Sequence, residues 1–152
     1  MEAAPQPSAT LGPAGLFRRL AALFYDGLLL TAVLFLATVP VLFITGGEAV
    51  PTGDLLFRTY IFLVCYGYFA FSWRRGGQTL GMKTWWIRVE RADGATLTLP
   101  DTMMRFAVAL VSAACLGLGF LWALVDREGR TWHDRAAGTR VIRLAKPPRR
   151  RS

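Results

Sequence analysis

Cysteine and histidine are scarce in this chain of 152 residues. The two cysteines, Cys65 and Cys115, lie inside apolar stretches and cannot build a disulfide framework or a zinc-binding spacing. His133 is the only histidine, so no second imidazole can join it on a metal ion. No nucleophile with an oxyanion site accompanies it either. The sequence therefore predicts no metal, no cofactor and no enzyme activity.

Acidic residues are also few, 10 against 18 lysines and arginines, which gives a formal net charge of +8. A basic balance is one feature of proteins that bind nucleic acids. Here the basic residues lie in loops and tails beside apolar stretches, where they set membrane topology and meet anionic lipid head groups. We therefore expect the lipid bilayer as the partner, and no nucleic acid.

Long apolar stretches are abundant. Three blocks, residues 20–45, 55–73 and 103–125, are each long enough to cross a bilayer core as a helix, which takes about 20 apolar residues. A chain this small has too little polar surface to cover all three blocks in a soluble fold. The sequence predicts an all-α integral membrane protein with two full transmembrane helices and a third apolar helical segment.

The charges beside the blocks predict the orientation and the domain limits. Arginines precede the first block and follow the second, whereas residues 46–54 contain acidic residues and no lysine or arginine. Because cytoplasmic loops carry the excess of basic residues, we expect a multi-pass protein with a cytoplasmic N-terminus. Residues 1–15 are predicted to be a disordered tail, residues 16–144 the membrane domain, and residues 145–152 a basic C-terminal tail.

The third block has two alternative placements. A single crossing would leave a C-terminal segment with nine basic residues outside, which contradicts the charge rule. A re-entrant or in-plane segment that turns near Gly117–Gly119 keeps both flanks inside. Non-helical backbone at that depth needs cover from protein or water. The charge count favours this second placement and leaves a spanning segment open.

A small cytoplasmic β-hairpin is predicted between the second and third blocks. Ile87 and Val89 alternate with polar residues, Asp93–Gly94 is a typical hairpin turn, and "TLTL" supplies the return strand. Pro100 ends that strand, and Asp101 can cap the helix that follows.

The glycine-rich stretch "GGQTLGMKT", residues 76–84, is similar at first sight to a phosphate-binding loop. That motif requires lysine directly after its second glycine, but Met82 separates Gly81 from Lys83. We interpret the stretch as a turn between helix and hairpin, with Gln78 available as a polar contact.

Asp26 is the only charged residue between residues 20 and 45. A carboxylate at the centre of a membrane helix costs roughly 2.5–3.5 kcal/mol on insertion scales. Arg19 shares its helix face but lies about 10 Å away along the axis, so a partner is expected on another segment. Arg105 is the best-placed cation. The alternative is a neutral, protonated carboxyl group hydrogen-bonded inside the bundle.

A polar cluster, "RTWHDRAAGTR", follows the third block. Thr131 to Asp134 fits the acidic variant of a capping box, which predicts a short helix ending at Gly138. An ion-pair network is the alternative role for Asp134, and the two roles are compatible.

Three motifs together resemble those of the RDD family of bacterial membrane proteins, named for one arginine and two aspartates. They are "RRLAALFYD", "GGQTLGMKTWWIRVERADG" and "RTWHDRAAGTRVI", in this order within residues 15–144. The resemblance places the arginine on Arg19, with Arg18 as the alternative, and the aspartates on Asp26 and Asp134. It implies a protein of the bacterial inner (plasma) membrane whose molecular function is undefined, with transport of some ligand suggested.

Two functional hypotheses follow. The first is transport of an ion or small solute with Asp26 on the path, because an intramembrane carboxylate usually marks a functional site. It needs a homo-oligomer or a partner membrane protein, since two or three spans cannot enclose a path. The second is a non-transporting accessory or assembly protein of a membrane complex, in which Arg19, Asp26 and Asp134 are structural. The further candidates for the path or the charge network are Asp134, Arg19, Arg105, His133 and Gln78.

Overall fold

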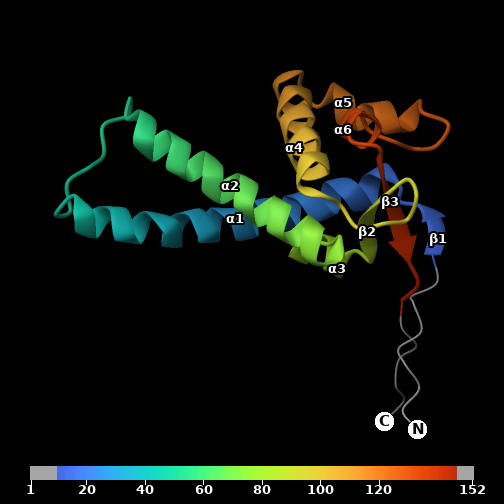
Figure 1. Ribbon diagram of the computed structural model, residues 1–152, viewed down its shortest axis with the longest axis horizontal. Helices are drawn as coiled ribbons and strands as arrows, with labels where there is room; N and C mark the ends of the chain where they lie inside the picture. Colours follow the sequence, from blue (N-terminus) through green and yellow to red (C-terminus); the bar gives the residue numbers. More distant parts are fainter. Residues whose placement is uncertain (1–9, 147–152) are drawn as a thin grey trace, which may run out of the picture.

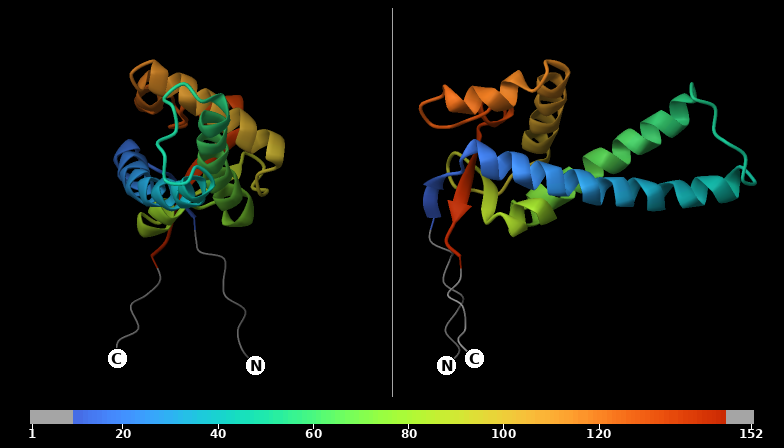
Figure 2. Two further views of the ribbon diagram at one scale, coloured as in Figure 1. Left: turned by 90° about the vertical axis from the view of Figure 1, so that its left-hand side faces the viewer. Right: turned by 180° about the vertical axis from the view of Figure 1, so that it is seen from behind.

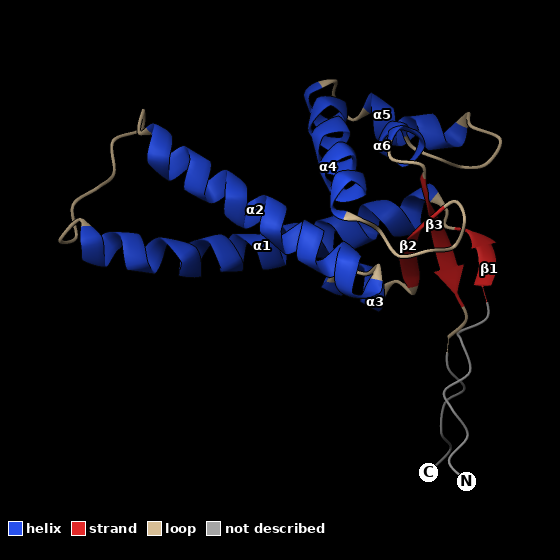
Figure 3. Cartoon of the chain, viewed as in Figure 1, coloured by secondary structure: helices blue, strands red, loops and turns tan. Residues whose placement is uncertain are grey.

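The computed structural model describes residues 10–146, which form a mostly helical fold with a small three-stranded sheet at one end (Figures 1 and 3). Two of its helices are long and apolar enough to cross a membrane. In chain order the elements are β1 (Thr10–Pro13), α1 (Leu16–Ile44), α2 (Leu55–Gly76), α3 (Leu80–Thr84), β2 (Ile87–Arg91), α4 (Leu99–Ala114), α5 (Leu118–Leu121), the 3-10 helix η1 (Trp122–Leu124), α6 (Trp132–Ala136) and β3 (Thr139–Leu144).

Helices α1 and α2 are the two long apolar elements, with 29 and 22 residues. At 1.5 Å per residue both exceed the roughly 30 Å of a bilayer core. Asp54 caps the start of α2 by accepting the backbone N–H of Phe57 at 2.6 Å. The two helices lie together near α3 and diverge toward the loop that joins them (Figures 1 and 2). Most of their apolar side chains, such as Phe35 and Phe43, therefore stay exposed.

The predicted hairpin is wrong in its second strand. The turn at Asp93–Gly94 forms, with the Arg91 N–H bonded to the Ala95 carbonyl at 3.0 Å. Residues 96–98, however, are not a strand, because α4 begins at Leu99. Asp101 contributes to that start from the third helical position by accepting the Thr98 N–H at 2.8 Å, so Thr98 and not Asp101 is the capping residue.

Strand β3 takes the place of the predicted return strand. It pairs antiparallel with β2, with Val89 opposite Val141, and lies at the centre of the sheet order β1-β3-β2. Strand β1 pairs with its other edge. The prediction of disorder for residues 1–15 is therefore wrong for Thr10–Pro13, because β3 offers this polar-poor segment an unpaired edge; the rest of that tail up to residue 9 lies outside the described residues.

The third apolar block is broken where the sequence predicted a turn. Helix α4 ends at Ala114, the chain passes through left-handed conformations at Leu116 and Gly117, and α5 with η1 leaves at 109° to α4. Counted as one bent unit, this pair is a third candidate span. Helix α4 runs across α1 and not alongside it (Figure 2).

The core lies at the sheet end of the molecule. Ile87, Val89 and Val141 of the sheet pack with Ala22 of α1 and Phe106 of α4. All of these are at most 8 % exposed. The core therefore ties the start of α1, the end of α2 and the C-terminal elements into one polar end from which the long helices project.

Candidate functional site: two buried carboxylates and a cavity

Asp134 is fully buried at the centre of an ion cluster. Its Oδ2 accepts a hydrogen bond from Arg19 Nη1 at 2.5 Å, and its Oδ1 accepts one from Arg105 Nη1. The two guanidinium side chains are 7 % and 3 % exposed, so this is not a solvent-screened surface pair. A buried carboxylate with two cations and good geometry is strongly destabilised by loss of its partners.

Local sequence sets the position of this carboxylate. Thr131 and Asp134 form the predicted capping box of α6: Oδ2 accepts the Thr131 N–H at 3.1 Å, and the Thr131 hydroxyl accepts the Asp134 N–H at 3.3 Å. Gly138, with a φ of 60°, follows the helix as predicted. The same side chain thus closes a helix and pairs with two arginines, so both predicted roles are present.

Arg19 ties three segments together from the first turn of α1. Besides Asp134 it donates to the Ala14 carbonyl at 3.0 Å and to the Gly129 carbonyl at 2.9 Å. Arg18, its alternative in the motif, points elsewhere and donates to the Trp85 carbonyl at 3.1 Å. Arg19 is therefore the arginine of the cluster.

Arg105 approaches Asp134 from the second turn of α4. Its Nη1 also donates to the Thr139 hydroxyl at 2.7 Å, and its guanidinium lies over the ring of Trp73 at 5.2 Å from the centroid. Cation–π contacts of this kind add to the stability of a desolvated guanidinium. The sequence assigned Arg105 to Asp26; the structure assigns it to Asp134, so that prediction is wrong.

Burial and the neighbouring arginines shift the pKa values of Asp134 and His133 on α6. Burial raises the pKa of the Asp134 carboxyl, but the positive charges of Arg105 and Arg19 outweigh it and hold the pKa well below its usual range. For His133, burial and the charge of Arg105 lower the pKa to about 3. The histidine is therefore neutral at physiological pH and packs against the Phe120 ring at 4.9 Å.

Asp26 is 2 % exposed and has no cationic partner among residues 10–146. Its Oδ1 accepts the Tyr68 hydroxyl at 2.7 Å and the Gly81 backbone N–H at 2.9 Å, and its Oδ2 accepts the Thr79 hydroxyl. These donors come from α2 and from the first turn of α3. Hydrogen bonds to the charged form stabilise a carboxylate without a counter-ion.

The glycine-rich motif makes this arrangement possible. A Cβ on Gly81 would lie 2.2 Å from the Ala22 carbonyl oxygen and 2.9 Å from the Asp26 carboxylate. Only glycine therefore allows the backbone of α3 to approach α1 so closely. Gln78, the predicted polar contact, donates to the Ile87 carbonyl at 2.8 Å and lies away from both carboxylates.

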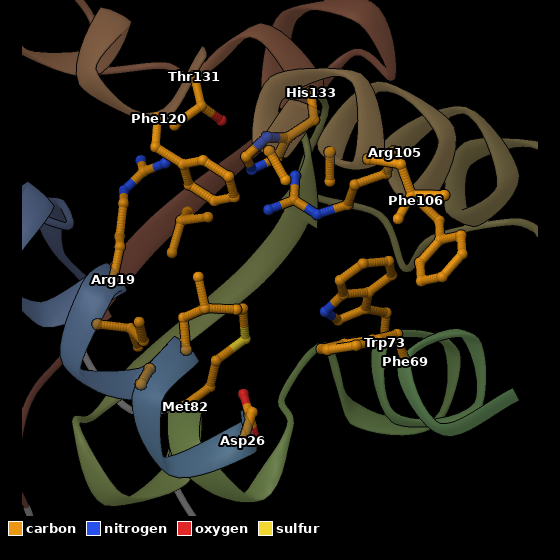
Figure 4. A pocket seen from close by; sticks show the side chains of 17 residues that line it. Arg19, Asp26, Phe69, Trp73, Met82, Arg105, Phe106, Phe120, Thr131 and His133 are labelled. Carbon is orange, nitrogen blue, oxygen red and sulfur yellow. The ribbon is translucent and has the colours of Figure 1, made fainter. Parts of the chain in front are cut away.

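A cavity of about 230 Å³ lies between Asp26 and the two arginines that pair with Asp134 (Figure 4). Its walls combine apolar side chains of α1, α2, α4 and the sheet with a few polar groups. The site candidates on its walls are Arg19, Asp26, Arg105 and His133. Within residues 10–146, no group of three or more His, Cys, Asp or Glu side chains could hold a metal ion.

Four partners in this site are not predicted by the sequence: Tyr68, Thr79, Thr139 and Trp73. Thr79 sits inside the "GQT" motif, so the motif itself was a signal. The other three carry no local pattern, because a hydroxyl or indole inside an apolar helix or strand is common.

Fold and site together define a small helical protein with two span-length apolar helices, fastened at one end by an arginine–aspartate–arginine cluster and a second caged aspartate. The chain belongs to the RDD family, whose model matches residues 13–138 and so includes Arg19, Asp26 and Asp134. No curated protein and no solved structure matches the chain.

Proposed function

We propose that this chain is an integral protein of the bacterial inner membrane that serves as an accessory or assembly module of a membrane complex. The observation that carries the proposal is that every oxygen of the Asp26 and Asp134 carboxylates accepts a hydrogen bond from inside the fold. Carboxylates bonded in this way hold segments of the fold together. A carboxylate on a transport path has to exchange its hydrogen-bond partners. Both carboxylates therefore have a structural role.

The surface for a partner is the divergent part of α1 and α2. Phe35, Leu36 and Phe43 of α1 and Leu56 of α2 are each more than two-thirds exposed. Helices of another membrane protein, or of a second copy, can pack there through van der Waals contacts.

The proposed orientation has the sheet end in the cytoplasm. Arg18 and Arg19 lie at the start of α1, Arg74 and Arg75 lie in the last turn of α2, and all of the strands gather at this end (Figure 3). Because α4 runs across α1, we propose the in-plane arrangement for the third block, with its exposed Met103 and Met104 in the membrane interface.

Cysteine labelling tests this orientation. In a background that lacks Cys65 and Cys115, Glu48→Cys should react with an impermeant reagent from the periplasmic side, and Ser152→Cys only after the membrane is opened. Labelling of both positions from the periplasmic side would overturn the in-plane arrangement and favour a third crossing.

Transport is the second candidate, with the chain as a homo-oligomer and Asp26 on the path. The observation in its favour is that Asp26 lines the cavity. Ion flux into proteoliposomes that contain the native chain or Asp26→Asn separates the candidates, with the mass of the detergent-solubilised protein measured in parallel. The accessory role predicts no flux from either protein; flux that Asp26→Asn abolishes would establish transport instead.

A further inference from the structure

Three buried nitrogen atoms on residues that line the cavity have no hydrogen-bond partner in the part of the chain that the structure describes. They are Nε1 of Trp73, Nε of Arg105 and Nδ1 of His133, and all three residues are at most 6 % exposed. The first two can only donate, whereas the nitrogen of a neutral imidazole can donate or accept. An unpaired buried donor is costly, so an acceptor that reached the donors of both Trp73 and Arg105 would be bound favourably. Figure 4 shows the indole nitrogen of Trp73 turned toward the open centre.

The geometry of Arg105 defines the acceptor. Its Nη1 is committed to Asp134 and Thr139, so the Nε edge is the side left for another group. One edge of a guanidinium presents parallel N–H groups that match the two oxygens of a carboxylate. The Trp73 ring lies 5.2 Å from the guanidinium carbon, and its N–H is a second unpaired donor next to this group. A hydroxyl offers a single oxygen in the same place, and an ester offers one strong acceptor, its carbonyl oxygen, without a charge.

Most of the other lining side chains are apolar, and the exposed ones among them belong to α1 and α4. Leu23 of α1 and Leu110 of α4 line it and are both more than two-fifths exposed, and the small side chains of Ala109 and Ala113 leave room between them. In the proposed membrane orientation this mouth faces lipid. The volume of about 230 Å³ is below the usual size of a drug-like pocket, so it takes a head group and the first carbons of one chain.

We propose that the cavity binds the carboxylate of a single-chain fatty acid, with the head against Arg105 and Trp73 and the acyl chain leaving between α1 and α4 toward the bilayer. His133 is neutral and adds no charge to the site, so the attraction comes from the arginines. Asp26 also lines the cavity and repels an anion, so the head group lies at the Arg105 end, which Figure 4 shows opposite Asp26. The proposal uses the membrane placement given above and is independent of whether the chain is accessory or transports.

Binding of oleate and of oleyl alcohol to the full chain in detergent, measured by native mass spectrometry, tests the proposal. We expect one oleate per chain, bound about tenfold or more tightly than the alcohol, because only the acid pairs with the guanidinium edge. Trp73→Phe keeps the ring and removes the N–H, and should weaken oleate binding about three- to tenfold. Equal binding of acid and alcohol would overturn the proposal and leave the cavity to water.

Two substitutions on α4 locate the site. Ala109→Phe fills the cavity and should abolish binding, whereas Ala107→Phe places the same ring on an exposed part of the same helix and should leave binding intact. If Ala109→Phe lowers the melting temperature, Leu23→Trp narrows the exposed mouth from the α1 side and takes its place. Equal binding by the filled and control variants, or displacement of oleate by a phospholipid at equal concentration, would refute the site. Neither result affects the labelling that tests orientation.

Discussion

Asp134 and Asp26 are both buried inside the fold, but of the two only Asp134 is paired with cations among residues 10–146. Asp134 accepts hydrogen bonds from two guanidiniums and one backbone N–H. Asp26 accepts hydrogen bonds from two hydroxyl groups and one backbone N–H, and none of these donors carries a charge. A carboxylate can therefore be held inside this fold either by counter-ions or by neutral donors alone.

The two arrangements differ in what remains when the carboxylate is removed. Removal of the Asp134 carboxylate would leave two buried positive charges without a counter-ion, and the desolvation of such charges is costly. The same removal at Asp26 would leave hydroxyls and an amide, which cost far less when they are unpaired. The comparison therefore ranks the effects of substitution at the two positions.

The largest expected effect is that of Asp134→Ala. Removing the carboxylate leaves Arg19 and Arg105 buried without a counter-ion, which should lower the free energy of unfolding by roughly 3–5 kcal/mol. Thermal and chemical unfolding in detergent measure the loss, with Asp93→Ala as the control. Asp93 is a largely exposed carboxylate beside Arg91, and its removal should cost about 0.5 kcal/mol or less. Similar losses from the two variants would mean that Asp134 is not the centre of the cluster.

A double-mutant cycle measures the pair between Arg19 and Asp134 directly. Arg19→Ala leaves Asp134 with Arg105, so its loss should be smaller than that of Asp134→Ala. The double variant should lose less than the two single losses added together, by about 1–3 kcal/mol, because the groups touch. Additive losses would mean that the two side chains do not interact and that Asp134 serves only as the cap of α6.

The sequence predicted the parts of this site that depend on local pattern. The apolar lengths predicted α1 and α2, and the Thr131–Asp134 spacing predicted the capping box. The Gly117 region predicted the break after α4. Each of these rests on residues within a few positions of one another, where periodicity, capping and backbone conformation act directly.

Apart from the cap of α4, where Thr98 and not Asp101 is the capping residue, the wrong predictions concern partners that are distant along the chain. The turn at Asp93–Gly94 forms, but the partner of β2 begins nearly fifty residues later at Thr139, and no local rule could choose it over the adjacent "TLTL". For Asp26 the sequence favours a charged partner, because charge is visible in a sequence, and leaves a neutral carboxyl group hydrogen-bonded inside the bundle as the alternative. Its real donors are two hydroxyls and a backbone N–H brought together by the close approach of Gly81, which only the folded chain shows.

Acid should weaken the cluster through the neighbour of Asp134. Burial and the charge of Arg105 lower the pKa of His133 to about 3, against about 6.5 in an unfolded chain. The unfolded state therefore binds the proton first, and the stabilisation present above pH 6.5 declines as the pH falls toward 3. Between pH 7 and pH 5 the expected loss is roughly 2 kcal/mol.

Unfolding of the native chain and of His133→Gln at both pH values checks this expectation. The variant should lose most of the pH dependence of the free energy of unfolding in this interval, because His133 is the only histidine in the chain. A native chain as stable at pH 5 as at pH 7 would show that His133 becomes charged in the folded state.

Asp26→Asn should have the smallest effect on the free energy of unfolding. It therefore gives the clearest test of the difference between Asp26 and Asp134. The amide oxygen can still accept from Tyr68 and Gly81, and the new N–H₂ group faces Thr79, whose hydroxyl can turn to accept. No charge is left unpaired, so we expect a loss of about 1 kcal/mol in the free energy of unfolding. Asp134→Asn should lose more, because there the N–H₂ group would point at a guanidinium. Asp26→Leu removes every acceptor and should fall between the two; an Asp26→Asn variant as unstable as Asp134→Asn would show that Asp26 has a cationic partner after all.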